Sequence, residues 1–239
     1  WLCSLRRCSL SLPFTLRFKL IPKQVYVSWK TKDIINSDSP IVVNGIRRLK
    51  ELNVDWDITV YDDNEVDVYL KNNLDTSDYL LIANKHIVEK TDLWRLFKLY
   101  YDGGVYVDLD RLCNKRLDDI ADENIKWVLP TCLDNDFSHD FMMSAPYNPA
   151  FANTIDLYLQ RRREGHTNVY FLGPQTYMHA VTKTLMGEAI NTNPGVEVFA
   201  EIRETIDRMS FIKTYRESPP YDTIISVSYT HLTLPTILL

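Results

Sequence analysis

The stretch of residues 88–110 constrains the fold more than any other part of this 239-residue chain. Residues 88–102 predict a helix, because their apolar positions recur at spacings of three and four residues. Gly103-Gly104 ends that helix, and the β-branched and aromatic residues 105–107 predict a buried strand directly after it. The apolar stripe of the helix consists of Leu93, Leu96, Phe97 and Tyr100. A helix followed without a gap by a buried strand is typical of an α/β fold.

The rest of the interior repeats this alternation of strands and helices. Short β-branched and aromatic runs predict strands at residues 25–29 and 56–61. Helical periodicity predicts helices at 41–53, at 149–163 and at about 175–187. Hydrophobic residues make up 45% of the chain, which is enough for one packed core. We therefore expect a mixed sheet flanked by helices.

Two acidic residues, Asp108 and Asp110, follow the strand at 105–107. Alternation along a strand would point both side chains to one face, at the carboxyl end where open α/β sheets bind ligands. Adjacent carboxylates repel one another, and a hard divalent cation such as Mg²⁺ or Mn²⁺ relieves that repulsion. A bare D-x-D is also common at a solvated strand end, so the spacing alone leaves both interpretations open.

Asp92 and Arg95 lie one helical turn apart, away from the apolar stripe of their helix. Arg95 suits a phosphate or hydroxyl partner, and Asp92 could accept hydrogen bonds from sugar hydroxyls. The simpler alternative is a surface ion pair that adds a few tenths of a kcal/mol to helix stability.

The central motif has a specific resemblance. Asp92-Leu93-Trp94-Arg95, followed by Tyr101 through Asp110, resembles the D-x-x-R…Y-x-x-G-G-x-Y-x-D-x-D signature of the glycosyltransferases with a DXD sugar-binding region. That group includes glycosyltransferase family 32, fungal outer-chain mannosyltransferases, capsular polysaccharide enzymes and, more distantly, the clostridial glucosylating toxins. Flanking similarities lie at Ile21-Pro22-Lys23…Trp29, Leu117-Asp118-Asp119-Ile120 and Gly173-Pro174.

This resemblance implies a GT-A type, Rossmann-like fold that binds a nucleotide sugar. It implies a metal-dependent, retaining hexosyltransferase that uses Mn²⁺ or Mg²⁺ and a UDP-sugar or GDP-sugar donor, with a glycan, lipid or protein hydroxyl as acceptor. Asp92 and Arg95 would be the catalytic residues that hold the donor sugar, and Asp108 and Asp110 the metal ligands. The donor-binding residues implied in the same way are Trp29, which would stack on the base, Gly103, Gly104 and Asp108.

Two other classes of protein share part of the pattern. Phosphohydrolases of the haloacid-dehalogenase type also place D-x-D at a strand end, but they require Thr or Val where this chain has Leu112. That class also leaves the helix with Asp92 and Arg95 unexplained. A sugar-nucleotide-binding module without catalysis is the second alternative, and the complete acidic motif disfavours it.

The two ends of the chain differ from its interior in composition. Residues 1–20 mix Leu, Ser and Arg, and we interpret them as an extension outside the domain. Residues 227–239 resemble a translated sequencing adapter, which predicts an artefactual tail. The glycosyltransferase domain is then expected at residues 21–226, with its carboxyl-terminal part truncated.

Charge and the remaining side chains narrow the possible partners. A net charge of −5 argues against nucleic acid, and the uncharged stretch at residues 8–16 is shorter than the roughly 20 residues of a membrane span. A cytoplasmic location is the resulting expectation. The histidines lack metal-ligand spacing, although His139-Asp140 lies in a loop that could face the acceptor. Trp94 and Trp127 are expected in the core or the wall of the cleft.

Overall fold

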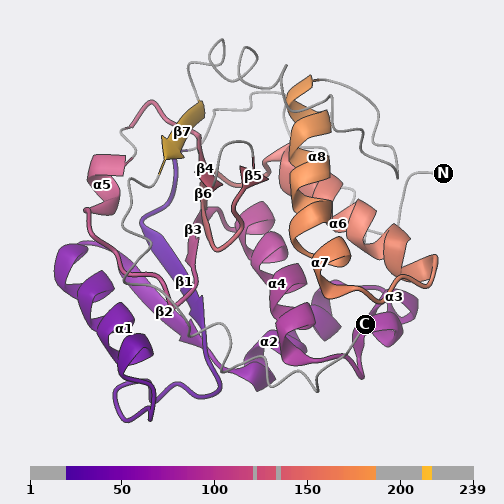
Figure 1. Cartoon of the computed structure of the whole chain (residues 1–239), viewed down its shortest axis with the longest axis horizontal. Helices are drawn as coiled ribbons and strands as arrows, with labels where there is room; N and C mark the ends of the chain where they lie inside the picture. Colours follow the sequence, from indigo (N-terminus) through magenta and orange to yellow (C-terminus); the bar gives the residue numbers. More distant parts are fainter. Residues whose placement is uncertain (1–19, 121–122, 133–135, 187–211, 217–239) are drawn as a thin grey trace.

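The computed structural model describes residues 20–120, 123–132, 136–186 and 212–216 (Figure 1). The interpretations of residues 1–19 and 227–239 lie outside the described residues, and the boundaries of the domain stay a prediction. Among the helices of the described ranges, none combines the length and the apolar character that crossing a membrane requires.

The strands form one mixed sheet in the order β2-β1-β3-β6-β4-β5, with β7 pairing with β4. Strands β2, β1 and β3 run parallel to one another, whereas β6 pairs antiparallel with both β3 and β4. This confirms the expected mixed sheet. The strands are β1 (Gln24–Ser28), β2 (Asp57–Tyr61), β3 (Gly104–Val107), β4 (Trp127–Cys132), β5 (Asp136–Phe137), β6 (Phe141–Ser144) and β7 (Ile212–Arg216).

Helices cover both faces of the sheet, as Figure 1 shows, with α1 on one side and α4, α6 and α8 on the other. The helices are α1 (Pro40–Leu52), α2 (Asp63–Asn73), α3 (Thr76–Ile82), α4 (Ile87–Tyr101), α5 (Leu117–Ile120), α6 (Pro149–Arg163), α7 (Val169–Leu172) and α8 (Pro174–Met186). Two hydrophobic layers result, one on each side of the sheet.

Strict alternation along the central strands divides their side chains between these two layers. Val105 and Val107 of β3 pack into the layer beneath α1, while Tyr106 between them packs into the layer beneath α4. Met142 and Met143 of β6 divide in the same way. Because successive side chains of a strand point to opposite faces, this short sequence builds both cores at once.

The expected elements agree with the observed ones to within about two residues at each end, and 149–163 matches α6 throughout. The chemistry of the segment after β2 was missed. Asp62 does more than end the strand, because its carboxylate accepts from the Glu65 backbone N–H at 2.9 Å while Glu65 accepts from the Asp62 N–H at 3.1 Å. This reciprocal capping box begins α2.

Candidate active site

Helix α4 passes through the interior, which decides how its two charged side chains behave. Residues 90–99 are all buried, and Asp92 and Arg95 are only 6% and 5% exposed. The surface ion pair that the sequence left open as an alternative is therefore wrong. The stripe of Leu93, Leu96 and Phe97 packs in the core, and the opposite side of the helix turns the ion pair toward the end of β3.

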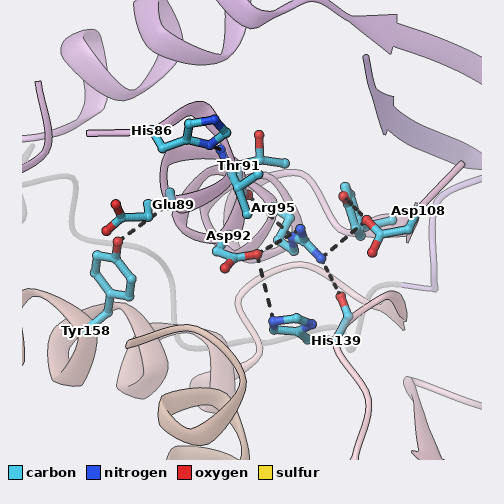
Figure 2. A network of polar contacts seen from close by, with 10 residues as sticks. His86, Glu89, Thr91, Asp92, Arg95, Asp108, His139 and Tyr158 are labelled. Carbon is cyan, nitrogen blue, oxygen red and sulfur yellow. Dashed lines mark hydrogen bonds and ion pairs between the residues drawn. The ribbon is translucent and has the colours of Figure 1, made fainter. Parts of the chain in front are cut away.

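Arg95 lies at the centre of a polar network, as Figure 2 shows. Its Nη2 is 2.8 Å from Asp92 Oδ1, and its Nη1 is 3.4 Å from Asp108 Oδ1 and donates to the His139 backbone carbonyl at 3.0 Å. Its guanidinium carbon lies 4.3 Å from the centre of the Tyr106 ring. One arginine thus joins α4, the end of β3 and the chain that leads into β6, and it fixes both carboxylates.

Asp108 and Asp110 lie at the carboxyl end of β3, as expected, but for a different geometric reason. The strand ends at Val107, and residues 108–111 form a turn in which the Arg111 N–H donates to the Asp108 carbonyl at 3.0 Å. The alternation of a strand therefore does not apply to the two acids. Leu109 between them is buried, and Asp108 lies near enough to raise the pKa of Asp110.

The antiparallel pairing of β6 with β3 brings two more residues to this edge. Val107 pairs with Phe141, so His139 and Asp140, just before β6, lie beside Asp108. The Asp108 N–H donates to the Asp140 carbonyl at 2.8 Å, and the Asp140 carboxylate pairs with Arg111. The sequence placed His139-Asp140 in a loop that could face the acceptor, but it did not predict the contacts of Asp140 with Asp108 and Arg111.

The acidic side chains of the site share a raised pKa, as the following three carboxylates show. Burial and the nearby Asp108 raise the pKa of Asp92 to about 6 against the opposing effect of Arg95. Burial, with Asp108 and Asp140 nearby, raises the pKa of Asp110 to about 6. Burial also raises the pKa of Asp108, although Arg95 opposes it. Negative charge is therefore concentrated beyond what the local arginines neutralise.

A divalent cation would neutralise this excess of negative charge. Asp110 Oδ1 is buried and has no hydrogen-bond partner among the described residues, so it is available as an oxygen ligand. The same residues include no group of three or more His, Cys, Asp or Glu side chains that could hold one metal. Mg²⁺ is commonly held by one or two carboxylates together with substrate phosphates, and Asp110 with Asp108 can supply such a pair.

The other donor-binding residues expected from the sequence divide into two groups. Trp29 follows β1, and its N–H donates to the Tyr61 carbonyl at 3.0 Å. Because β1 and β3 run parallel, Trp29 and Asp108 lie at the same edge of the sheet. Gly103 and Gly104 lie at the amino end of β3, about 13 Å from Asp108 for four residues of extended chain.

Backbone geometry alone explains why residues 103 and 104 are glycines, and no contact with a ligand is needed to explain them. Their φ angles are +70° and +97°, which favour glycine. A Cβ on Gly103 would lie 2.7 Å from Pro146, and one on Gly104 would lie 2.6 Å from the Gln24 carbonyl oxygen. They shape the turn from α4 into β3, and their placement gives no support to the predicted contact with the donor.

Gly173, unlike Gly103 and Gly104, lies directly against a side chain of the site. It ends α7 with φ −85°, which any residue can adopt. However, a Cβ there would lie 2.5 Å from Asp92 Oδ2. Close approach of the α7–α8 turn to the Asp92 carboxylate therefore requires glycine at this position. Trp94 and Trp127, by contrast, are core residues, as expected.

The part of the chain that holds the buried acid network is similar to a known family. Residues 18–127, less than half of the chain, match the family described as glycosyltransferase sugar-binding region containing DXD motif. The match includes Trp29 and the four motif residues Asp92, Arg95, Asp108 and Asp110. The chain is thus similar to the DXD-motif glycosyltransferases over this region, and its fold is of the GT-A type.

Individual relatives agree with this class. The chain is 28% identical over 137 residues to the mannosyl phosphorylinositol ceramide synthase CSH1 of Saccharomyces cerevisiae, which covers 57% of this chain and 35% of that protein. It is 27% identical over 135 residues to the inositol phosphoceramide mannosyltransferase 1 of Schizosaccharomyces pombe, covering 56% and 42%. The matches therefore span less than half the length of these relatives.

Among solved structures, the PaToxG glycosyltransferase superposes with a TM-score of 0.57 at 17% sequence identity. The superposition covers 79% of this chain and 76% of the other. At this identity the likeness concerns the fold alone. Because it covers 79% of the chain, the superposition extends beyond residue 127, where the match to the family ends.

Proposed function

We propose that this protein transfers a hexosyl group from a nucleotide diphosphate sugar to an acceptor hydroxyl, with retention of configuration and with Mn²⁺ or Mg²⁺. One observation carries the proposal. The buried network of Asp92, Arg95 and Asp108 lies beside Asp110, whose Oδ1 is buried and has no hydrogen-bond partner within the described part of the chain. Such a concentration of acidic groups with raised pKa values is typical of a functional site.

Each acidic residue has a defined part in this proposal. Asp110, with Asp108 beside it, would hold the divalent cation. When bound, the cation supplies Lewis-acid stabilisation of the charge that develops on the leaving diphosphate. Asp92 faces the same space and can accept hydrogen bonds from the hydroxyls of the donor sugar.

Arg95 is better described as a positioning residue. Its Nε donates to the Thr91 carbonyl at 3.4 Å, and its Nη atoms contact Asp92, Asp108 and the His139 carbonyl. With its donors directed to protein groups, Arg95 fixes the two carboxylates in place before a substrate arrives. Such preorganisation lowers the cost of reaching the transition state, since little reorientation remains.

The relatives narrow the donor and the acceptor. The first yeast relative is named a mannosyl phosphorylinositol ceramide synthase and the second an inositol phosphoceramide mannosyltransferase, which favours mannose as the hexose. Their names also point to an inositol phosphoceramide as acceptor, so a lipid hydroxyl is the first acceptor to test beside glycans and proteins. Release of nucleotide from UDP-sugars and from GDP-sugars distinguishes the two possible nucleotides of the donor.

The test is release of nucleotide from a panel of UDP-sugars and GDP-sugars by the 239-residue chain. With Mn²⁺, we expect one donor to be hydrolysed, and we expect EDTA or Asp110→Asn to reduce the rate by at least about a hundredfold. Asp119→Asn is the matched control, because Asp119 is exposed on α5. It should leave the rate unchanged.

The outcomes separate the alternatives. Metal-dependent donor binding without hydrolysis, and without transfer to any acceptor offered, would favour the sugar-nucleotide-binding module. A folded chain that neither binds nor hydrolyses any donor contradicts the proposal. So does a rate that Asp110→Asn and EDTA leave unchanged.

A further inference from the structure

The site contains buried polar atoms that the proposed roles do not use. Among the described residues, His139 Nε2 and Tyr177 Oη are buried without a hydrogen-bond partner, like Asp110 Oδ1. Folded proteins pair nearly all such atoms, so each unpaired one needs a specific cause. The two rings are neighbours, with centroids 6.2 Å apart. Unpaired atoms gathered at one site are what a polar ligand would satisfy.

His139 is held firmly from its backbone. Its carbonyl accepts from Arg95 Nη1 at 3.0 Å, and the next residue, Asp140, accepts from the Asp108 N–H at 2.8 Å. The imidazole packs against Tyr177 and points to the Asp92 carboxylate, as Figure 2 shows. The ring is thus aimed by the same network that fixes the acidic residues.

The distance between His139 and Asp92 is informative. His139 Nε2 lies 3.8 Å from Asp92 Oδ1, which is too long for a hydrogen bond between them. The separation is nevertheless short enough that one hydroxyl oxygen can lie about 2.8 Å from both atoms at once. A hydroxyl both donates and accepts, so it can donate to the carboxylate and still pair with the imidazole in either tautomer.

The charge state of His139 suits a neutral partner. Burial, Arg95 and Arg111 hold the pKa of His139 well below its usual value, so the imidazole is neutral at pH 7. A neutral ring does not form a strong ion pair with Asp92, and at 3.8 Å the two side chains do not form a hydrogen bond either.

We propose that His139 Nε2 and Asp92 Oδ1 together bind one hydroxyl of the donor sugar. This inference rests on the proposed function and adds to it a residue that selects the sugar rather than the nucleotide. The simpler alternative is that His139 only fills the core against Tyr177. In that case the loss of its ring nitrogens would not change how the protein discriminates between a nucleotide sugar and the bare nucleotide.

The experiment compares His139→Phe and His139→Gln with the wild-type chain. Phe preserves the aromatic contact with Tyr177 but removes the polar atom, whereas Gln places an amide nitrogen near the position of Nε2. Calorimetry at pH 7.5 with Mn²⁺ measures the Kd for the donor selected from GDP-mannose, UDP-glucose and UDP-N-acetylglucosamine. It also measures the Kd for the matching nucleotide diphosphate.

We expect His139→Phe to weaken donor binding by about 5- to 100-fold and to leave the Kd of the nucleotide unchanged. His139→Gln should recover part of the loss. A second set of donors, each lacking a different hydroxyl of the selected sugar, is titrated into both chains. A single member of the set should bind wild type and His139→Phe with equal Kd, because the hydroxyl that His139 binds is already absent.

Each contrary outcome has its own meaning. If His139→Phe binds donor as tightly as wild type, or weakens donor and nucleotide alike, the inference is overturned while the proposed function stands. If no missing hydroxyl changes the affinity of wild type, the inference is overturned without any variant. If wild type binds none of the donors, both the proposed function and this inference are overturned.

Discussion

Helix α4 carries two acid–base pairs that look alike in the sequence but differ in their surroundings. Asp92 and Arg95 are three residues apart, and Lys98 and Asp102 are four apart. Both basic side chains are buried, at 6% and 9% exposure. The acids differ, since the side chain of Asp92 is 7% exposed and that of Asp102 is 42% exposed.

The Lys98 pair is complete in itself. Its Nζ lies 2.5 Å from Asp102 Oδ2 and between 4.5 and 5.3 Å from the centres of the Tyr26, Tyr61 and Tyr69 rings. Three aromatic faces and one solvated carboxylate satisfy this ammonium. The pair therefore stabilises the junction of α4 with the sheet and needs no ligand.

The Arg95 pair is compensated only in part. Arg95 serves Asp92 and Asp108 together, and a third and a fourth carboxylate, Asp110 and Asp140, lie nearby. Burial and this crowding raise the pKa of Asp92 to about 6. Comparison of the two pairs shows that burial of an ion pair does not by itself indicate function. Carboxylate charge that the neighbouring arginines do not neutralise does indicate a functional site.

Replacement of Arg95 should have the largest effect. Arg95→Met leaves Asp92 and Asp108 buried without their cation, so we expect donor turnover to fall about a thousandfold and the free energy of unfolding to fall by about 3–5 kcal/mol. Arg95→Lys preserves the charge but not the planar donors, and should recover stability better than turnover. Donor hydrolysis and urea unfolding measure the two effects. If a folded Arg95→Met variant turned over the donor at the wild-type rate, the functional difference between the Arg95 and Lys98 pairs would be contradicted.

Gly173→Ala should act on the same carboxylate from the opposite side. The added Cβ would lie 2.5 Å from Asp92 Oδ2, so the carboxylate must move, and turnover should fall about 10- to 100-fold. Gly165→Ala is the matched control, because φ is +87° there but a Cβ meets nothing within 4 Å. It should cost about 1 kcal/mol of stability and leave turnover unchanged. Equal turnover of both variants contradicts the role of Gly173.

The pH dependence of stability should also separate the two pairs. The pKa of Asp92 is about 6 in the folded chain and about 4 when unfolded, so the folded state binds more protons between these values. Its stabilising contribution is complete below about pH 4 and is lost as pH rises through 6, roughly 2–3 kcal/mol in all. Unfolding of metal-free protein between pH 4.5 and 7 should show this slope, to which Asp110 also contributes because burial raises its pKa to about 6. Asp92→Asn should therefore reduce the slope without abolishing it, and an unchanged slope would contradict the assignment.

Lys98→Met should have the smallest effect on function. Asp102 remains solvated after the substitution, so we expect a stability loss of about 1–2 kcal/mol and donor turnover within about twofold of wild type. Thermal unfolding and the hydrolysis assay measure both. A loss of turnover comparable to that of Arg95→Lys would remove the distinction between the pairs.

The sequence predicted most of the fold, because hydrophobic periodicity and turn residues are local signals. It placed α1, α4, α6, α8 and the three parallel strands to within about two residues. It missed α2, since the capping role of Asp62 depends on Glu65 three residues later. It also gave no sign of β4–β6, whose short apolar runs acquire meaning only through pairing with β3.

For the site, the sequence named the acidic motif but not its full surroundings. Asp92, Arg95, Asp108 and Asp110 form a recognisable linear pattern, and the fold brings all four together. Asp140 and the orientation of His139 come from antiparallel pairing 30 residues later in the chain, which no local pattern encodes. Gly103 and Gly104 belong to the same linear motif, yet they shape the opposite end of β3.

The most direct test of the central claim is an electron paramagnetic resonance titration of Mn²⁺ into the 239-residue chain with and without nucleotide diphosphate. The account predicts that the signal of free Mn²⁺ falls with one ion bound per chain, more tightly when UDP or GDP is present. It predicts that Asp110→Asn abolishes this binding and that Lys98→Met does not. Undiminished binding by folded Asp110→Asn, or no binding by wild type with either nucleotide, would contradict it.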